Sequence, residues 1–383
     1  MSGHEGAVWE SYFSPKAEMR LVSLIERKNR ALHRANQMLN PSINAIQFRQ
    51  GNARHSNSVY CVLAVYQPET FPPDIVALVE ELNRQKINVI FAVNATPRDI
   101  EEKLPNECHT FIRRNNHGYD FGAYKTGVEF ALTLSPKRLI VLNDSVHFFE
   151  GENLSKYISR LSKDGHPFIG ATESHEIRYH IQSYCYSFNE DVLTSAAFKN
   201  FWSSYVPMNE RRYTVLNGEV ALTSAISMAG FHPRALFRVG DLRDHLLSVD
   251  APELIAASDL LPSSTRETRK NRIVGWLANE HDKYNFMRGI RKQQAVEEIC
   301  RTVYDGNQVG LGALVFAKYL GMPFIKKNLA KYRYFSPPDI FAGMNAACLV
   351  EGNPDEHLIN LFKQQESHSP TKWEKFNQRH MFR

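Results

Sequence analysis

Apolar residues in the middle of the chain alternate between short continuous runs and stripes at helical spacing. The continuous runs predict strands at Val59–Val65, Asn88–Val93, 111–112, Arg138–Leu142, 167–171, Ile181–Phe188 and 231–238. Helical spacing predicts a helix capped by Asp74, with Ile75, Leu78, Val79 and Leu82 as its stripe, and further helices at 121–134, 153–163, 190–203 and 219–229. Strands that alternate with helices at this spacing predict an α/β fold, with a mostly parallel sheet and helices on both faces.

The two ends of the chain differ from this middle part. A helix is expected from Pro15 to Asn40, ended by Pro41, and residues 41–57 have the polar, Gly/Asn/Ser-bearing composition of a linker. Helical signals dominate from residue 251 onward. We therefore expect an N-terminal helix and linker at 1–57, an α/β domain at 58–250 and a mostly helical C-terminal region at 251–383.

Composition excludes several classes of protein. The 383 residues are 43% hydrophobic and 23% charged, which is typical of a globular chain, and the net charge of +5 gives no reason to expect nucleic-acid binding. Five scattered cysteines without a CxxC pair argue against a zinc ribbon or a disulfide framework and favour a reducing compartment. No signal peptide or membrane-spanning run is readable, so a cytoplasmic location is expected.

Positive charge is concentrated in two segments. Residues 1–54 carry eight Lys/Arg against four Asp/Glu, and residues 264–292 carry eight against three. Such segments either form solvated helix faces or contact anionic lipid at the inner face of the cytoplasmic membrane. The N-terminal helix could instead mediate formation of a homo-oligomer.

Polar residues that could carry chemistry follow the predicted strands. In an open α/β sheet, ligands bind where strands end. Tyr66 follows the first strand, Asn143-Asp144-Ser145 ends the most apolar one, and residues 115–127 form a polar loop with Gly118 and Gly122. Asp120 could cap a helix or accept hydrogen bonds from a sugar hydroxyl, and Asp144 could cap a turn or bind a divalent cation. Glu219 opens a later helix, where a structural role is common.

These residues lie within motifs that resemble the rhamnan synthesis protein F family of bacterial polysaccharide glycosyltransferases. The resemblance covers roughly residues 58–336. Its motifs are NHGYDFGAYK at 116–125, LNDSV at 142–146, HIQSYCYSFN at 180–189, GEVALTSAISMAGF at 218–231 and GMPFIK at 321–326. The resemblance implies a GT-A-like, Rossmann-type fold and an inverting transfer of a sugar from a nucleotide-sugar donor to a saccharide acceptor in O-antigen or cell-wall assembly. The resemblance suggests dTDP-L-rhamnose as the donor and a growing surface polysaccharide, free or lipid-linked, as the acceptor.

The resemblance also implies roles for individual residues. Glu219 corresponds to the catalytic base, and the donor is expected to contact Tyr66, Asn116, Gly118, Asp120, Lys125, Asp144 and Ser145. Acceptor contacts are expected from Glu173, His180, Gln182, Ser183 and Tyr184. Lys125 or Arg113 would stabilise the leaving diphosphate, unless Mg²⁺ or Mn²⁺ at Asp144 does so.

This chain departs from the family pattern at two of these positions. The usual D-x-D motif is reduced to Asn143-Asp144-Ser145, and Val220 stands where a second acid is expected after Glu219. Metal-independent catalysis, transfer of a different sugar and a non-catalytic glycan-binding or scaffold role therefore remain open alternatives.

Overall fold

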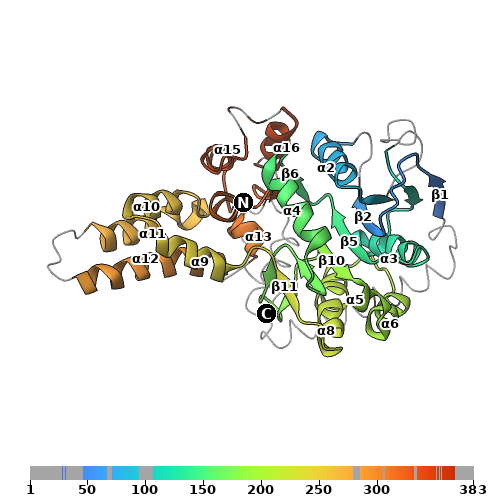
Figure 1. Ribbon diagram of the computed structural model, residues 1–383. Coiled ribbons are helices and arrows are strands. Elements are labelled where there is room, and N and C mark those ends of the chain that lie inside the picture. Colours follow the sequence, from blue (N-terminus) through green and yellow to red (C-terminus); the bar gives the residue numbers. More distant parts are fainter. Residues whose placement is uncertain are drawn as a thin grey trace, which may run out of the picture.

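The chain folds around one large mixed sheet with helices on both of its faces (Figure 1). The computed structural model describes residues 28, 31, 46–66, 71–94, 107–278, 285–304, 307–331, 334–350, 352, 354 and 356–366. The helix expected from Pro15 to Asn40 therefore lies outside the described residues, apart from positions 28 and 31, which are helical. The same holds for most of the basic segment at 1–54.

The main sheet has eight strands in the order β1-β4-β3-β2-β5-β10-β7-β11. They are β1 (Ile46–Gln50), β2 (Val59–Val65), β3 (Asn88–Asn94), β4 (Thr110–Arg114), β5 (Arg138–Asn143), β7 (Phe168–Gly170), β10 (Cys185–Asn189) and β11 (Pro233–Ala235). Strands β4, β3, β2 and β5 run parallel, as β7 and β11 do, whereas β1 and β10 pair antiparallel with their neighbours. The predicted α/β class with a mostly parallel sheet is confirmed.

Side chains that alternate along the central strands divide the core into two. From β2, Cys61, Leu63 and Val65 enter one core, whereas Val62 and Ala64 enter the other. The first core lies under α2 (Pro73–Arg84) and α4 (Glu152–Lys163). The second lies under α3 (Tyr119–Leu132), α5 (Glu190–Thr194), α6 (Ala196–Ser204) and α8 (Ala221–Met228). A strand covered on both faces reads as a continuous apolar run, and that run predicted β2.

Several elements differ from the sequence expectation for identifiable physical reasons. Residues 46–50, expected in a linker, form β1 at the sheet edge, where the side chains of residues 47–50 are all exposed and a polar composition is allowed. Asp74 does not cap α2, because Pro72 occupies the cap position and the Asp74 carboxylate turns toward Lys327. The helix expected at 190–203 is split, because Ser195 accepts a hydrogen bond from Phe198 N at 3.2 Å and starts α6. The strand expected at 231–238 is only β11, which ends at Ala235, with three residues between it and the start of α9 (Val239–Ser248).

Four helices form an arm that projects from the sheet (Figure 1). These are α9, α10 (Ala251–Asp259), α11 (Ser263–Leu277) and α12 (Asn285–Tyr304). The arm carries the second basic segment, and several of its cations pair with acids: Arg266 with Asp339, Arg269 and Arg272 with Glu298, and Lys270 with Asp259. Among the residues that the structure describes, no helix combines the length and apolar composition needed to cross a bilayer.

The chain after the arm returns to the sheet domain. It forms α13 (Gln308–Leu311), α14 (Ala313–Leu320), β12 (Phe324–Lys326), α15 (Pro337–Ala346) and α16 (Glu356–Glu366). Strand β12 pairs antiparallel with β6 (Val146–Phe148), which follows directly after β5. A buried ion pair reinforces this contact, with Lys327 Nζ 3.0 Å from Asp74 Oδ2. The C-terminal region is therefore part of the same packed body as the sheet.

Candidate functional site

A cleft of about 310 Å³ opens where β5 and the start of α3 meet the C-terminal region. Its walls come from five parts of the chain: the start of α3, the turn after β5, the segment around β9 (His180–Ile181), the helix that carries Glu219, and the region around β12. The lining residues are Tyr119, Asp120, Asn143, Ser145, Glu176, Ile177, His180, Gln182, Ser183, Tyr184, Arg211, Thr214, Val215, Glu219, Asn307, Lys326 and Asn328. Segments far apart in the sequence thus form one site.

Hydrogen bonds join the ends of two strands and the start of α3 beside the cleft. Asn143 Nδ2 donates to Asp120 Oδ2 at 2.9 Å, and Asn143 Oδ1 accepts from the hydroxyl of Ser145 at 2.6 Å. Tyr66 N, directly after β2, donates to Asp144 Oδ2 at 2.9 Å. The ends of β2 and β5 therefore lie close to the start of α3.

The backbone before α3 aims Asp120 into the cleft. Gly118 and Tyr119 both have left-handed φ angles, +81° and +50°, which is unusual for a tyrosine. Arg114 Nη2 donates to the carbonyl of His117 at 2.8 Å and Gly118 N donates to Asn209 Oδ1 at 2.6 Å, so the loop is held from two sides. Unfavourable backbone conformations of this kind are often found at functional sites.

Asp120 lies in a strongly perturbed electrostatic environment. Burial, together with the nearby carboxylates of Asp144 and Glu219, raises the pKa of Asp120 to about 7, while Lys326 and the hydrogen bond from Asn143 act in the opposite direction. A carboxyl group with a pKa near neutrality can hold or release a proton at physiological pH. A cleft residue with such a pKa is a candidate for function on physical grounds.

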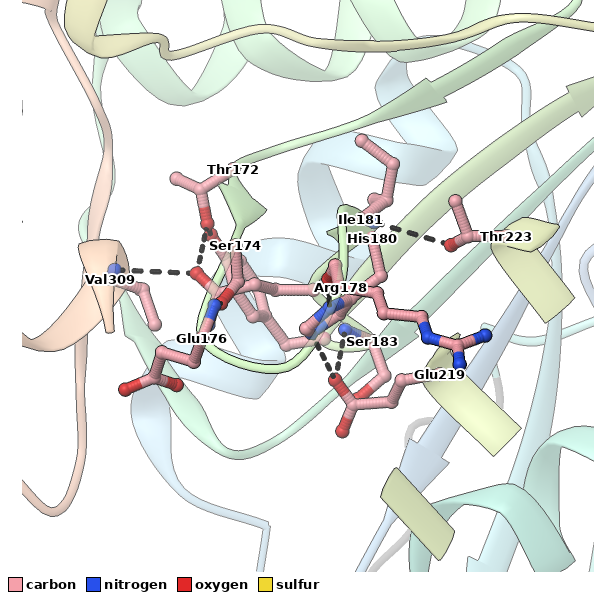
Figure 2. Close-up of polar contacts among 12 residues, drawn as sticks. Thr172, Ser174, Glu176, Arg178, His180, Ile181, Ser183, Glu219, Thr223 and Val309 are labelled. Atoms are coloured by element: carbon pink, nitrogen blue, oxygen red, sulfur yellow. Dashed lines mark hydrogen bonds and ion pairs between the residues drawn. The ribbon is translucent and has the colours of Figure 1, made fainter. Parts of the chain in front are cut away.

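Glu219 lies in a short π-helix, η2 (Val215–Val220), that leads into α8. Its side chain is 19% exposed, and Oε2 lies 3.4 Å from Ser183 N and 3.8 Å from His180 Nε2 (Figure 2). His180 Nδ1 is 2.8 Å from the carbonyl of Arg178, which can only accept, so the proton lies on Nδ1 and Nε2 faces the carboxylate. π-Helical turns are often found at functional sites, and here the turn places a carboxylate at the cleft wall.

The predicted acceptor residues lie mostly along one wall. Gln182 Oε1 accepts from the Thr172 hydroxyl at 2.6 Å and from Val309 N at 3.4 Å, so it connects the domain to the C-terminal region. Tyr184 OH lies 2.6 Å from the Thr172 hydroxyl. Glu173, in β8 (Glu173–Ser174), does not line the cleft and instead accepts a hydrogen bond from Tyr179.

Five of the seven predicted donor residues have no side chain in the cleft wall, and Asp144, whose carboxylate accepts from Tyr66 N as described above, is one of them. Asn116 is exposed on the loop, Gly118 is the helix cap described above, and the ring of Tyr66 is 47% exposed outside the lining. Lys125 Nζ points to the far side of α3, where it binds the carbonyl of Trp202 and lies 2.9 Å from Glu129 Oε1. Arg113 does not line the cleft either.

The sequence analysis did not assign a role to the two cations that line the cleft, Lys326 and Arg211. Lys326 ends β12 and Arg211 begins α7 (Arg211–Thr214). The GMPFIK motif contained the signal for Lys326, but its contact with the cleft depends on the pairing of β12 with β6. Within the described parts of the chain, no group of three or more His, Cys, Asp or Glu side chains is placed to hold a metal ion.

Comparison with known proteins identifies relatives with partial coverage. The chain is 29% identical to the uncharacterized protein y4gN of Sinorhizobium fredii over 189 residues, which is 47% of this chain and 49% of that protein. It is 27% identical to the virulence protein VirA of Vibrio anguillarum over 154 residues, 39% of this chain and 49% of that one. The matches therefore span about half the length of each relative.

Solved structures give only weak similarity. The structure named "putative nucleotide-diphospho-sugar transferase" from Desulfovibrio desulfuricans aligns over 64% of this chain and 97% of its own. The identity is 10% and the TM-score is 0.30. The mannosyltransferase PcManGT from Pyrobaculum calidifontis aligns over 87% and 88%, at 9% identity and a TM-score of 0.31. TM-scores this low do not establish a shared fold.

The family comparison is decisive because of its extent. The model of the family described as rhamnan synthesis protein F matches residues 89–293, more than half of the 383 residues. The matched region includes Asp120, Asn143, His180 and Glu219, and therefore most of the domain-side wall of the cleft. The chain belongs to the rhamnan synthesis protein F family.

Proposed function

We propose that this protein is a glycosyltransferase of GT-A-like architecture that moves a sugar from a nucleotide sugar to a saccharide acceptor. The observation that carries the proposal is the meeting of two carboxyl groups, Asp120 and Glu219, with the cation Lys326 in one cleft of about 310 Å³. That volume lies within the range of small-molecule sites. The reaction needs a base, a cation for the leaving group and polar groups for sugar hydroxyls, and this cleft holds all three.

Glu219 is the proposed base of an inverting transfer. The oxygen of the acceptor hydroxyl attacks the anomeric carbon on the face opposite the diphosphate, and its proton passes to Glu219. The bond from the anomeric carbon to the phosphate oxygen breaks, and the nucleoside diphosphate leaves with that electron pair. The contact of Glu219 Oε2 with Ser183 N, at 3.4 Å, is long and leaves the carboxylate able to accept a further hydrogen bond.

Lys326 and Arg211 are the proposed cations for the leaving diphosphate. Charge that develops on the diphosphate is stabilised most strongly by groups fixed in place before the reaction. Lys326 is fixed because β12 pairs with β6, and its neighbour Lys327 donates its backbone N–H to the carbonyl of Ser145 at 3.0 Å. This assignment replaces Lys125, which the structure turns away from the cleft.

A divalent cation is proposed as an auxiliary to these side chains. The carboxylates of Asp120 and Asp144 lie close enough for each to disfavour the charge of the other, and a cation would relieve that repulsion. Mg²⁺ commonly binds through one or two carboxylates plus substrate phosphates. Asp144 and Asp120 would hold Mg²⁺ or Mn²⁺ here, and the ion would neutralise diphosphate charge.

The proposed donor is dTDP-L-rhamnose and the proposed acceptor is a growing bacterial surface polysaccharide. Membership of a rhamnan synthesis family supports this choice. A different nucleotide sugar would use the same cleft residues. A non-catalytic glycan-binding role is the competing function, favoured by Val220 and by the missing second acid of the D-x-D motif at Asn143-Asp144-Ser145.

The test is substitution of the base in an assay of nucleoside diphosphate release. With dTDP-L-rhamnose and a rhamnose-terminated acceptor, Glu219→Gln should reduce turnover by about 10²–10⁴-fold, the usual contribution of a positioned acid or base. Donor affinity, measured by calorimetry, should stay within a few-fold of wild type because Glu219 acts on the acceptor. Glu190→Gln, an exposed carboxylate at the start of α5, is the matched control.

Two results would contradict the proposal. Turnover of Glu219→Gln near that of wild type would remove Glu219 as the base. A wild-type protein that releases no diphosphate from any of a panel of nucleotide sugars, yet binds rhamnose oligosaccharides, would favour the non-catalytic role.

A further inference from the structure

At the protein surface, the ring of His175 contacts the rings of two tyrosines. The ring centroids of His175 and Tyr179 are 5.2 Å apart, and those of His175 and Tyr304 are also 5.2 Å apart. Tyr179 is 36% exposed and Tyr304 is 48% exposed. We call these three residues the aromatic platform. Single exposed aromatic residues are ordinary, but a contiguous exposed group often marks a binding surface.

The aromatic platform comes from two separate parts of the chain. His175 and Tyr179 lie between β8 and β9, whereas Tyr304 is the last residue of α12. The rings therefore meet only because the arm returns to the sheet domain. Their exposure means that they do little to fill a core, so packing alone does not explain why they gather here.

Both chain segments that form the aromatic platform also contribute residues to the cleft wall. Glu176 and Ile177, which lie between His175 and Tyr179 in the sequence, both line the cleft. Asn307, three residues after Tyr304, lines it as well. A chain molecule that enters the cleft by this edge would pass over the rings.

Polar groups next to the rings suit a saccharide. Tyr179 is hydrogen-bonded to the carboxylate of Glu173, and Arg238 is near enough to interact electrostatically with both residues. Arg238 is itself held by Asp241, with Nη2 2.8 Å from Oδ1 and Nε 3.1 Å from Oδ2. Sugars present C–H faces that stack on rings and hydroxyls that bind carboxylates and guanidinium groups.

The same surroundings disfavour the other ligand that stacks on aromatic rings, which is a nucleotide base. The carboxylate of Glu173 lies beside Tyr179 and would repel a phosphate attached to a base stacked there. The cation beside the platform, Arg238, is already paired with Asp241, whereas the cleft holds the two cations Lys326 and Arg211.

We propose that the aromatic platform is an outer subsite that binds the acceptor polysaccharide at sugar units beyond the reacting end. The proposal rests on the proposed function, because it takes the cleft as the place of reaction. It assigns Tyr179 and Tyr304 the role of stacking on sugar rings, and Glu173 the role of binding hydroxyl groups. Longer acceptors should therefore bind better than short ones.

The test compares acceptors that differ only in length. For wild type, Tyr179→Ala, Tyr304→Ala and the double variant, kcat/KM is measured with an L-rhamnose disaccharide and a tetrasaccharide. The ratio of the tetrasaccharide value to the disaccharide value should fall about three- to tenfold in each single variant, as loss of one aromatic contact predicts. Tyr179→Phe should keep most of the wild-type ratio because it keeps the ring.

Direct binding separates this inference from the question of catalysis. Tetrasaccharide affinity of the donor-free full chain, measured by calorimetry, should fall in the same variants by the same factor. Phe48→Ala is the matched control, because Phe48 is also an exposed ring in aromatic contact, with Phe130 at 5.5 Å, but lies on the edge strand β1. It should change neither the ratio nor the affinity.

The possible results are distinguishable. Equal tetrasaccharide affinity in wild type and the double variant, or no binding by wild type, overturns the platform whether or not the protein turns over a donor. Platform-dependent binding in a protein that transfers no sugar supports the platform and refutes only the transfer.

Discussion

The pKa of the Asp120 carboxyl group is raised by its surroundings in the cleft. It lies in the cleft with Glu219, close to Asp144, and its charged form is opposed by burial and by both of these acids. Lys326 and Asn143 relieve only part of that cost. The folded protein therefore retains a proton on Asp120 at pH values where the unfolded chain releases it.

The proton on Asp120 makes stability depend on pH. The pKa of Asp120 is raised to about 7 in the folded state, so this group favours folding below its unfolded pKa near 3.8, and the contribution declines as pH rises toward 7. Asp120→Asn removes this dependence. The free energy of unfolding of the variant minus that of wild type should be larger at pH 8 than at pH 5, by up to about 2.5 kcal/mol.

Urea unfolding of both proteins at the two pH values measures this difference. Asp191→Asn, which changes an exposed acid in the first turn of α5, is the control and should show little pH-dependent change. The same stability difference between wild type and Asp120→Asn at pH 5 and pH 8 would mean that Asp120 ionises normally.

At the scale of residues, the sequence predicted the acids of the site better than its cations. Asp120 and Glu219 lie within two of the family motifs, and both line the cleft. Lys125 lies five positions after Asp120 on the same helix, which rotates it by roughly 140° about the axis and turns it toward α6. Lys326 lies about 200 residues further along, and no local pattern reports a contact made through strand pairing.

The π-helix η2 is the element that places Glu219. Its single widened turn sits directly before α8, and Gly218 in that turn packs against Phe121 of α3. A helix with regular spacing would present different residues to the cleft from the same sequence. The position of the proposed base thus depends on contact between two helices and not only on its own sequence.

Gly218→Ala tests that contact. The added Cβ would lie 2.9 Å from Cδ1 and Cε1 of the buried Phe121 ring, so either the ring or η2 must move. We expect a loss of about 1–3 kcal/mol in the free energy of unfolding, as for other overpacked cores. Transfer activity should fall as well, because Glu219 is the next residue.

Gly289→Ala provides the comparison for this change. Gly289 lies within α12, and an added Cβ would meet nothing within 4 Å. It should be neutral or stabilise the protein by up to about 1 kcal/mol, since alanine favours helix more than glycine. Stability of Gly218→Ala equal to that of Gly289→Ala in thermal or urea unfolding would show that η2 tolerates the added methyl group.

Among the elements, those buried on both faces were predictable and those defined by pairing at an edge were not. β2 matches its expected position, and β3 matches to within one residue, with a continuous apolar run between its terminal residues Asn88 and Asn94. β1, β6 and β12 are short or partly exposed, and only their partners make them strands. The π-helix was expected as the start of a regular helix, because hydrophobic periodicity does not reveal a single widened turn.

For the molecule as a whole, the ion pair between Asp74 and Lys327 holds two distant segments together. The side chain of Asp74 is fully buried in the first turn of α2, and Lys327 directly follows β12. His147 Nδ1 lies 3.8 Å from the same carboxylate. This contact stabilises the C-terminal wall of the cleft, including Lys326.

Breaking the pair on one side should be costly. Lys327→Met leaves a buried carboxylate without its lysine, and we expect a loss of about 3–5 kcal/mol in the free energy of unfolding. The double variant Asp74→Asn/Lys327→Met should lose clearly less than the sum of the two single changes. A double-mutant cycle by urea unfolding measures the coupling, and additive losses would show that the two residues do not interact.

The position of β2 has a consequence for how the protein can be divided. The region shared with the family begins at residue 89, yet β2 lies before it and separates β3 from β5 at the centre of the sheet. A fragment limited to residues 89–293 would contain β3 and β5 but lack β2, the strand that pairs with both. It would also lack Lys326. The smallest piece of the chain that can form the complete sheet therefore begins upstream of the matched region.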